Sequence, residues 1–172
     1  MKRVLLGLVA VVAVLVGTVL VRALTVRSKQ VDVPPAAKVA VDAQAAAQRL
    51  GGAVKLETVW QGADAPPFVA FRAYLKTTWP LVHEKLQREE VGPHLLFTWK
   101  GSDPSAAPII LMAHQDVVPV EEATLAKWTH PPWGGVVADG FVWGRGAVDD
   151  KGSLCAILEA VTLLLQEGVA PK

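Results

Sequence analysis

The stretch "PIILMAHQDVVPV", residues 108–120, joins an apolar run to a histidine and an aspartate that stand two positions apart. We expect a buried strand of a mainly parallel sheet at residues 109–114, because short apolar runs bounded by proline are typical of such strands. Alternate side chains of a strand point the same way, so His114 and Asp116 would project from one side of its C-terminal end. Open α/β sheets place their binding sites at that edge.

Two interpretations of this strand end are consistent with its own residues. His114 can be a metal ligand whose second ring nitrogen is held by Asp116, an arrangement that fixes the tautomer and makes the imidazole more basic. Alternatively, His114 is hydrogen-bonded at the end of a strand and Asp116 begins a turn. The His-x-Asp pattern alone does not distinguish a metal site from a structural strand end.

A second acidic motif occurs in the stretch "GRGAVDDKG", residues 144–152, where Asp149 and Asp150 stand before a predicted helix. One carboxylate is enough to cap that helix. Two adjacent acids can instead let one carboxylate bridge two metal ions while the other supports the backbone. The glycines do not form a phosphate loop, because no Gly-Lys-Ser/Thr follows and the two acids would repel a phosphate.

The remaining pattern predicts helices and a hairpin around the strand. Helical periodicity predicts an alanine-rich helix that ends at Gly51 and Gly52, a helix within residues 65–90 that is interrupted at Pro80, and a helix within residues 149–168. Residues 94–101 are expected to contain a strand, and Asp139-Gly140 predicts a tight hairpin turn. This order of elements indicates an α/β sheet with helices on its faces.

The N-terminal residues form a separate segment. Lys2 and Arg3 precede residues 4–21, which carry no charge and are long enough to span a bilayer as a helix. We expect residues 1–27 to anchor the protein in a membrane with the following part outside the cytoplasm; the alternative is a cleaved signal peptide and secretion. Residues 28–37 are expected to be a linker, and residues 38–172 a catalytic domain or part of one.

Charge and cysteine content exclude some classes of partner and bond. The chain has 17 basic and 16 acidic residues and a formal net charge of +1, which gives no electrostatic footprint for nucleic acid. Its single cysteine, Cys155, rules out a disulfide within the chain and is expected to be a small apolar residue inside a helix.

Several stretches together resemble the zinc-dependent metallopeptidase and aminoacylase family, which includes carboxypeptidase S, glutamate carboxypeptidase and succinyl-diaminopimelate desuccinylase. They are "LMAHQDVVPV" (residues 111–120), "KWTHPPWGGVVADGFVWGRGAVDDKG" (127–152) and the helix that follows. Upstream, "FRAYLKTTWPLVHEKL" (71–86) and "HLLFTWKGSDP" (94–104) resemble the carboxypeptidase S-like branch. The resemblance runs from about Phe68 to Gly168.

The resemblance implies a zinc exopeptidase-like catalytic domain with two zinc ions, for which cobalt or manganese could substitute. His114 matches a zinc ligand, Asp116 the acid that orients it and Asp149 the ligand that bridges the metals. Asp150 follows Asp149 across a peptide bond that is typically cis in the family. The implied substrate is a peptide or an N-acyl amino acid, from which hydrolysis of an amide bond releases an amino acid. A homodimer of the full-length protein is a further expectation.

The family's general-base glutamate follows the Asp-Asp motif, as do its remaining metal ligands and its lid or dimerisation domain. This sequence offers no match for them, because the adjacent acids Glu89-Glu90 and Glu121-Glu122 precede that motif. We therefore expect an incomplete catalytic domain that is not competent alone. The alternative is a truncated, inactive, membrane-anchored remnant with residual metal binding.

Overall fold

The computed structural model describes residues 2–31, 33–35, 39–62 and 64–172. The chain forms two compact units, Met1–Val39 and Ala40–Lys172. The helices and strands are α1 Lys2–Thr25, α2 Ala43–Val54, α3 Pro66–Thr78, α4 Pro80–Lys85, β1 Gln87–Val91, β2 His94–Thr98, η1 Glu122–Lys127, β3 Val136–Ala138, β4 Phe141–Trp143 and α5 Lys151–Gln166.

The first unit contains the apolar helix that the sequence predicts. α1 is 24 residues long and buries none of its side chains. Within the described part of the chain it is the helix that is long and apolar enough to cross a membrane. The described residues of the expected linker, 28–31 and 33–35, have no regular secondary structure, while Asp32, Ala36 and Ala37 of that linker lie outside the described residues.

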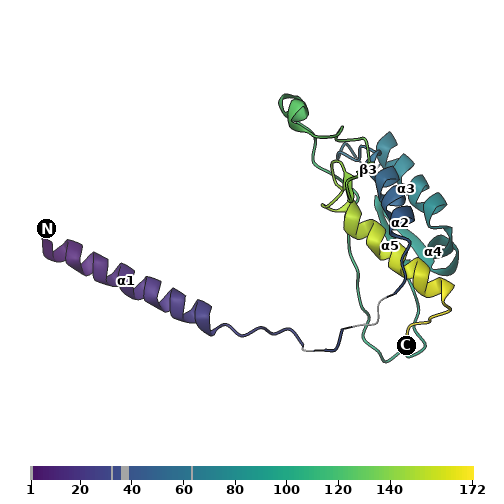
Figure 1. The fold of residues 1–172 in the computed structure, drawn as a ribbon. Coiled ribbons are helices and arrows are strands. Elements are labelled where there is room, and N and C mark those ends of the chain that lie inside the picture. The colour runs from purple at the N-terminus through teal and green to yellow at the C-terminus, as the bar shows by residue number, and fades with distance from the viewer. Residues whose placement is uncertain (1, 32, 36–38, 63) are drawn as a thin grey trace. The chain divides into compact units, whose positions relative to one another are not determined.

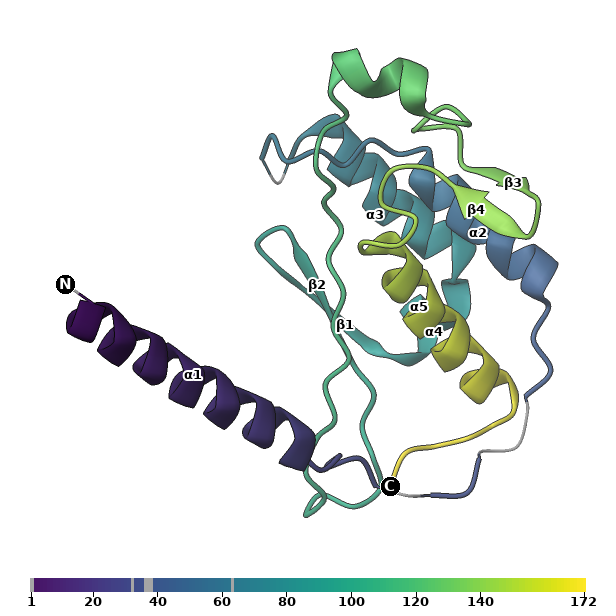
Figure 2. The ribbon, with the colours of Figure 1, turned by 60° about the vertical axis from the view of Figure 1, so that its left-hand side comes forward.

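The core of the second unit lies between helices α2, α3, α4 and α5 (Figures 1 and 2). From α3 through α4, and again within α5, its buried side chains recur three or four positions apart, which is the spacing of one helical face. Full burial of a valine, leucine or phenylalanine side chain contributes about 1.5–3 kcal/mol to the stability of the fold. The cluster consists of Ala53, Phe71, Leu75, Trp79, Val82, Leu86, Leu154, Cys155 and Leu158.

Helix α2 does not end where the sequence predicts, because it continues through Gly51 and Gly52 to Val54. Both glycines allow close packing. A Cβ on Gly51 would lie 2.5 Å from the carbonyl oxygen of Gly135, and one on Gly52 would lie 2.3 Å from the hydroxyl of Tyr74. The expected helix stop is therefore wrong, and its glycines bring α2 against the β3–β4 hairpin and α3.

The predicted interruption at Pro80 is confirmed, since α3 ends at Thr78 and α4 begins at Pro80. The expected strand in residues 94–101 is also confirmed, as β2.

The partner of β2, strand β1, occupies residues that we expected to be helical. β1 pairs antiparallel with β2 across a turn in which Gly92 has a φ of 60°. Strand pairing thus overrides helical periodicity there.

The predicted buried strand at residues 109–114 is not present. Residues 108–116 have no regular secondary structure, and the side chains of residues 109–112 are between 64% and 89% exposed. A strand requires a hydrogen-bonded neighbour. Among the described residues the sheets are the antiparallel pairs β1–β2 and β3–β4, and the isolated parallel bridge joins Val59 to Val117, beyond the apolar run. The structure is mixed α/β, but it does not contain the mainly parallel sheet.

The β3–β4 hairpin and helix α5, which flank the second acidic motif, form as predicted. Asp139 and Gly140 have φ values of 54° and 81° at the hairpin turn, as an Asp-Gly turn with both central residues at positive φ requires. Gly168, with a φ of 69°, follows the end of α5. The hairpin therefore leads the chain directly into residues 144–150, and α5 fixes their far end.

Candidate metal centre

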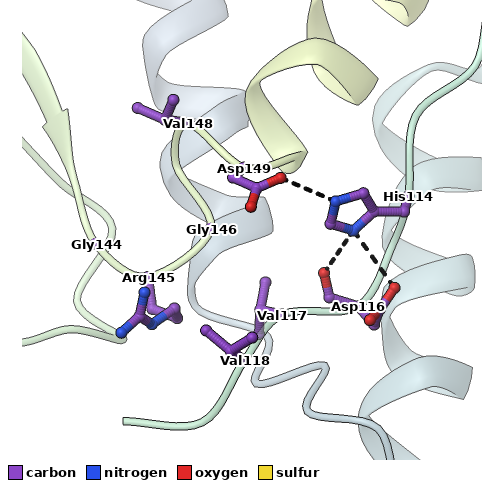
Figure 3. A pocket seen from close by; sticks show the side chains of 9 residues that line it. All are labelled: His114, Asp116, Val117, Val118, Gly144, Arg145, Gly146, Val148 and Asp149. Atoms are coloured by element: carbon purple, nitrogen blue, oxygen red, sulfur yellow. Dashed lines mark hydrogen bonds and ion pairs between the residues drawn. The ribbon is translucent and has the colours of Figure 1, made fainter. Parts of the chain in front are cut away.

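His114 and Asp149 meet at the start of helix α5, although they lie 35 positions apart in the chain. The Nε2 atom of His114 is 2.9 Å from Oδ1 of Asp149 (Figure 3). Both side chains reach solvent, with exposed fractions of 48% and 88%. The structure thus brings together the two residues that the sequence predicts as metal ligands.

The second ring nitrogen of His114 faces Asp116, whose carboxylate was predicted to hold it. The nearer partner of Nδ1 is the main-chain oxygen of Asp116 at 2.9 Å, while the carboxylate oxygen Oδ1 lies 3.4 Å away. A proton on Nδ1 can be donated to that carbonyl, and Nε2 donates to Asp149 only when the ring is doubly protonated; in the neutral ring the lone pair of Nε2 is available to a metal ion. Asp116 therefore contacts the imidazole mainly through its backbone.

Opposing effects act on the proton affinity of this histidine. Partial burial lowers the pKa of His114, but the hydrogen bond to Asp149 and the carbonyl and charge of Asp116 outweigh it. The pKa is raised above its usual 6.5 as a result. The carboxylates around the ring therefore attract positive charge to this position.

Asp150 does not cap helix α5 with its side chain. It occupies the N-cap position without a capping hydrogen bond, and its Oδ2 atom instead accepts the backbone N–H of His114 at 3.3 Å. The peptide bond between Asp149 and Asp150 is cis, as the resemblance implies. Each of the adjacent acids thus contacts His114, Asp149 at its ring and Asp150 at its backbone.

Gly146 allows this corner to approach the segment that carries His114. Its φ of 81° favours glycine, and a Cβ there would lie 2.4 Å from Cγ1 of Val117. The Gly146 carbonyl accepts the backbone N–H of Lys151 at 3.0 Å, which joins the corner to the first residue of α5.

A cavity of about 230 Å³ opens beside these residues. Its lining consists of His114, Asp116, Val117, Val118, Gly144, Arg145, Gly146, Val148 and Asp149 (Figure 3). Arg145 was not predicted as a site residue, although its Gly-Arg-Gly context stands just before the Asp149-Asp150 motif. The guanidinium lies over the ring of Trp128, 5.3 Å from its centroid.

The donor atoms fit part of a zinc site. An imidazole nitrogen and a carboxylate oxygen are usual zinc ligands, and a complete site needs about four. Within the described residues no group of three or more histidine, cysteine, aspartate or glutamate side chains is placed to hold a metal ion. His114 and Asp149 therefore supply a suitable but incomplete donor set.

Comparison with known proteins agrees with the resemblance seen in the sequence. Residues 110–172 match the family described as Peptidase family M20/M25/M40. The chain is 44% identical over 133 residues to "Probable carboxypeptidase S-like 2" of Dictyostelium discoideum. This match covers 73% of this chain and 25% of that protein. The chain is 41% identical over 136 residues to "Carboxypeptidase S" of Saccharomyces cerevisiae, covering 72% and 24%.

A third relative is the "N-fatty-acyl-amino acid synthase/hydrolase" of Mus musculus, 40% identical over 131 residues, with 73% of this chain and 25% of the relative covered. The chain thus spans about a quarter of the length of these relatives. The predicted resemblance to carboxypeptidase S-like proteins is confirmed over the part that matches.

Proposed function

We propose, from the match of residues 110–172 to peptidase family M20/M25/M40, that this chain carries part of the catalytic domain of a metal-dependent amide hydrolase. The observation that carries the proposal is the 2.9 Å contact between His114 Nε2 and Asp149 Oδ1 beside a cavity. The names of the relatives support a substrate that is a peptide or an N-acyl amino acid, from which an amino acid is released.

His114 would bind one zinc ion through Nε2, and Asp149 would bridge it to a second. When bound, zinc supplies Lewis-acid chemistry, because it acidifies water and polarises an amide carbonyl. The Asp116 carbonyl holds the Nδ1 proton so that Nε2 stays available, and Asp150 fixes the main chain of His114. Cobalt or manganese would suit the same donors. We assign no residue of this chain to the general base.

We further propose that the exposed run at residues 109–112 is a strand of a mainly parallel, exopeptidase-like sheet in the whole catalytic domain. Four adjacent apolar side chains, each at least 64% exposed, support this assignment. Hydrogen exchange of the full-length protein tests it. Protected amides at residues 109–113 are expected, and exchange as fast as in an unstructured loop would contradict it.

Helix α1 is proposed to anchor the protein in a membrane with the catalytic part outside the cytoplasm; cleavage and secretion are the alternative. Its length, its apolar composition and the flanking Lys2 and Arg22 support either. Retention in the membrane fraction after alkaline carbonate extraction is expected for an anchor. A mature N-terminus beyond residue 25 would show cleavage instead.

We also propose that the full-length protein forms a homodimer, and sedimentation of the full-length protein tests this.

A second candidate is an inactive, membrane-anchored remnant with residual metal binding. The observation that favours it is that the described residues bring two donors together but no group of three or more. A protein that binds zinc but hydrolyses no dipeptide or N-acyl amino acid would match this candidate.

The decisive experiment measures zinc content and amide hydrolysis of the full-length protein and of its His114→Ala variant. Loss of both zinc and hydrolysis is expected, because the variant removes the imidazole ligand. Unchanged zinc content and activity would rule out the proposed centre. His83→Ala serves as a control, since that imidazole packs against Phe97 and is not among the residues that line the cavity.

The position of Asp116 makes a finer prediction. Asp116→Asn keeps the main-chain oxygen that lies 2.9 Å from Nδ1 and loses only the more distant carboxylate. Its zinc affinity should therefore fall by about tenfold, the lower end of the usual effect of changing a residue that holds a metal-binding histidine. A loss as complete as in His114→Ala would show that the carboxylate itself is a ligand.

A further inference from the structure

Two buried polar residues connect the segments of the candidate metal centre to another part of the chain. Among the residues that the structure describes, Thr58 and Lys151 are the polar or charged ones whose surface is fully buried. A hydroxyl or an ammonium group is costly to bury unless it is hydrogen-bonded. The partners of these two side chains therefore indicate which segments they join.

Thr58 holds the segment that carries His114. Its hydroxyl donates to the carbonyl oxygen of Gln115 at 2.6 Å, and its own carbonyl accepts the backbone N–H of Val117 at 2.9 Å. Val59 forms the parallel bridge with Val117. The backbone on both sides of Asp116 is thus attached to residues 58–59.

Lys151 holds the segment that carries Asp149. It is the first residue of α5 and follows Asp149 by two positions. Its Nζ donates to the carbonyl oxygen of Ala53 at 3.0 Å and to that of Leu56, and it lies 4.9 Å from the centre of the Phe71 ring. Ala53 lies in the last turn of α2 and Leu56 two residues beyond its end, where the helix dipole favours a cation.

Both sets of bonds converge on residues 53–59. We propose that residues 53–59 form a strut that sets the separation of His114 and Asp149, and that Thr58 and Lys151 are its positioning residues. The direct contact between the ligands is solvent-exposed and holds its geometry weakly, whereas Thr58 and Lys151, which make the bonds to the strut, are themselves fully buried. This inference rests on the proposed metal centre, and it assigns these two residues no contact with substrate.

The test compares variants of the full-length protein. Thr58→Val removes the hydroxyl while keeping the shape of the side chain, Thr58→Ser keeps the hydroxyl, and Lys151→Met removes the ammonium group. Val82→Ala is the matched control, because it weakens the core in α4, outside the strut and the cavity lining. Zinc affinity comes from competition with a chromophoric chelator, ligand geometry from the absorption spectrum of bound Co²⁺, and stability from thermal unfolding.

We expect Thr58→Val and Lys151→Met to weaken zinc binding by about tenfold or more and to change the Co²⁺ spectrum. Thr58→Ser should behave like the wild type. Val82→Ala should lower the unfolding temperature without changing either metal readout. Wild-type affinity and spectrum in Thr58→Val would overturn the proposal, even if Lys151→Met fails to fold. Equal weakening in Val82→Ala would overturn it too, because metal binding would then only follow stability.

A readout without metal separates this proposal from the proposed function. NMR of the His114 ring in the metal-free protein should show one fixed environment in the wild type and exchange between several in Thr58→Val. If the wild type binds no zinc, the proposed hydrolase fails, and the ring signals still test the strut. Identical ring signals in wild type and Thr58→Val would overturn the strut alone.

Discussion

Glu159 joins helices α5 and α2 to the junction between α3 and α4, and its removal should destabilise the protein strongly. From α5, its carboxylate accepts two hydrogen bonds from the Arg49 guanidinium on α2, one of them at 2.7 Å and the other shorter. It also accepts the indole N–H of Trp79, between α3 and α4, at 2.9 Å. Trp79 is only 1% exposed, so this N–H has no ready access to water.

The expected loss follows from what Glu159→Ala leaves behind. A buried indole N–H without an acceptor costs about 1–3 kcal/mol. The Arg49 side chain is 33% exposed and can recover hydration, so losing the ion pair costs only about 0.5–1 kcal/mol more. The free energy of unfolding should therefore fall by about 1.5–4 kcal/mol. Glu159→Gln keeps an acceptor oxygen for Trp79 and should lose only about 1 kcal/mol.

Urea unfolding of the full chain in mild detergent, followed by tryptophan fluorescence, measures both variants. The midpoint should shift to lower urea while the slope stays constant, because the surface exposed on unfolding does not change. Arg49→Met in the same assay tests the separate contribution of the ion pair. A loss below about 1 kcal/mol for Glu159→Ala, or equal losses for the alanine and glutamine variants, would refute the role assigned to the Trp79 hydrogen bond.

Two further predictions concern the Gly146 corner and Cys155. Gly146→Ala should lower the free energy of unfolding by about 2–4 kcal/mol, because alanine is strained at positive φ and its Cβ would contact Val117. Gly140 also has positive φ but has open space around it, so Gly140→Ala should lower it by only about 1 kcal/mol. Thermal unfolding measures both variants, and equal losses of stability would contradict this reasoning. Burial raises the pKa of the Cys155 thiol from 9.0 to about 12, so a disulfide reagent at pH 8 should label it only after unfolding. Because the unfolded thiol ionises first, stability should fall as the pH rises above about 9, and rapid labelling of the folded protein would refute the assigned burial.

Local features were predictable because their causes lie within a few residues. Pro80 lacks a backbone N–H, so it cannot continue the preceding helix although it can begin the next one, and Asp139-Gly140 favours a tight turn. The errors arose where distant segments compete. Gly51 and Gly52 stay helical because Gly135 and Tyr74 pack against them. The apolar run at residues 109–112 forms no strand because no neighbouring strand lies beside it in the described part of the chain.

The candidate site shows the same division. Sequence alone determined that His114 precedes Asp116 by two positions, that Asp149 and Asp150 stand at the start of a helix, and that residues 110–172 match peptidase family M20/M25/M40. Tertiary packing brought His114 Nε2 to Asp149, 35 positions away, and gave Asp150 the His114 backbone N–H as its partner. The physical reason is that these contacts depend on the buried bonds between residues 53–59 and both segments, and no local periodicity encodes the distance between segments so far apart in the chain.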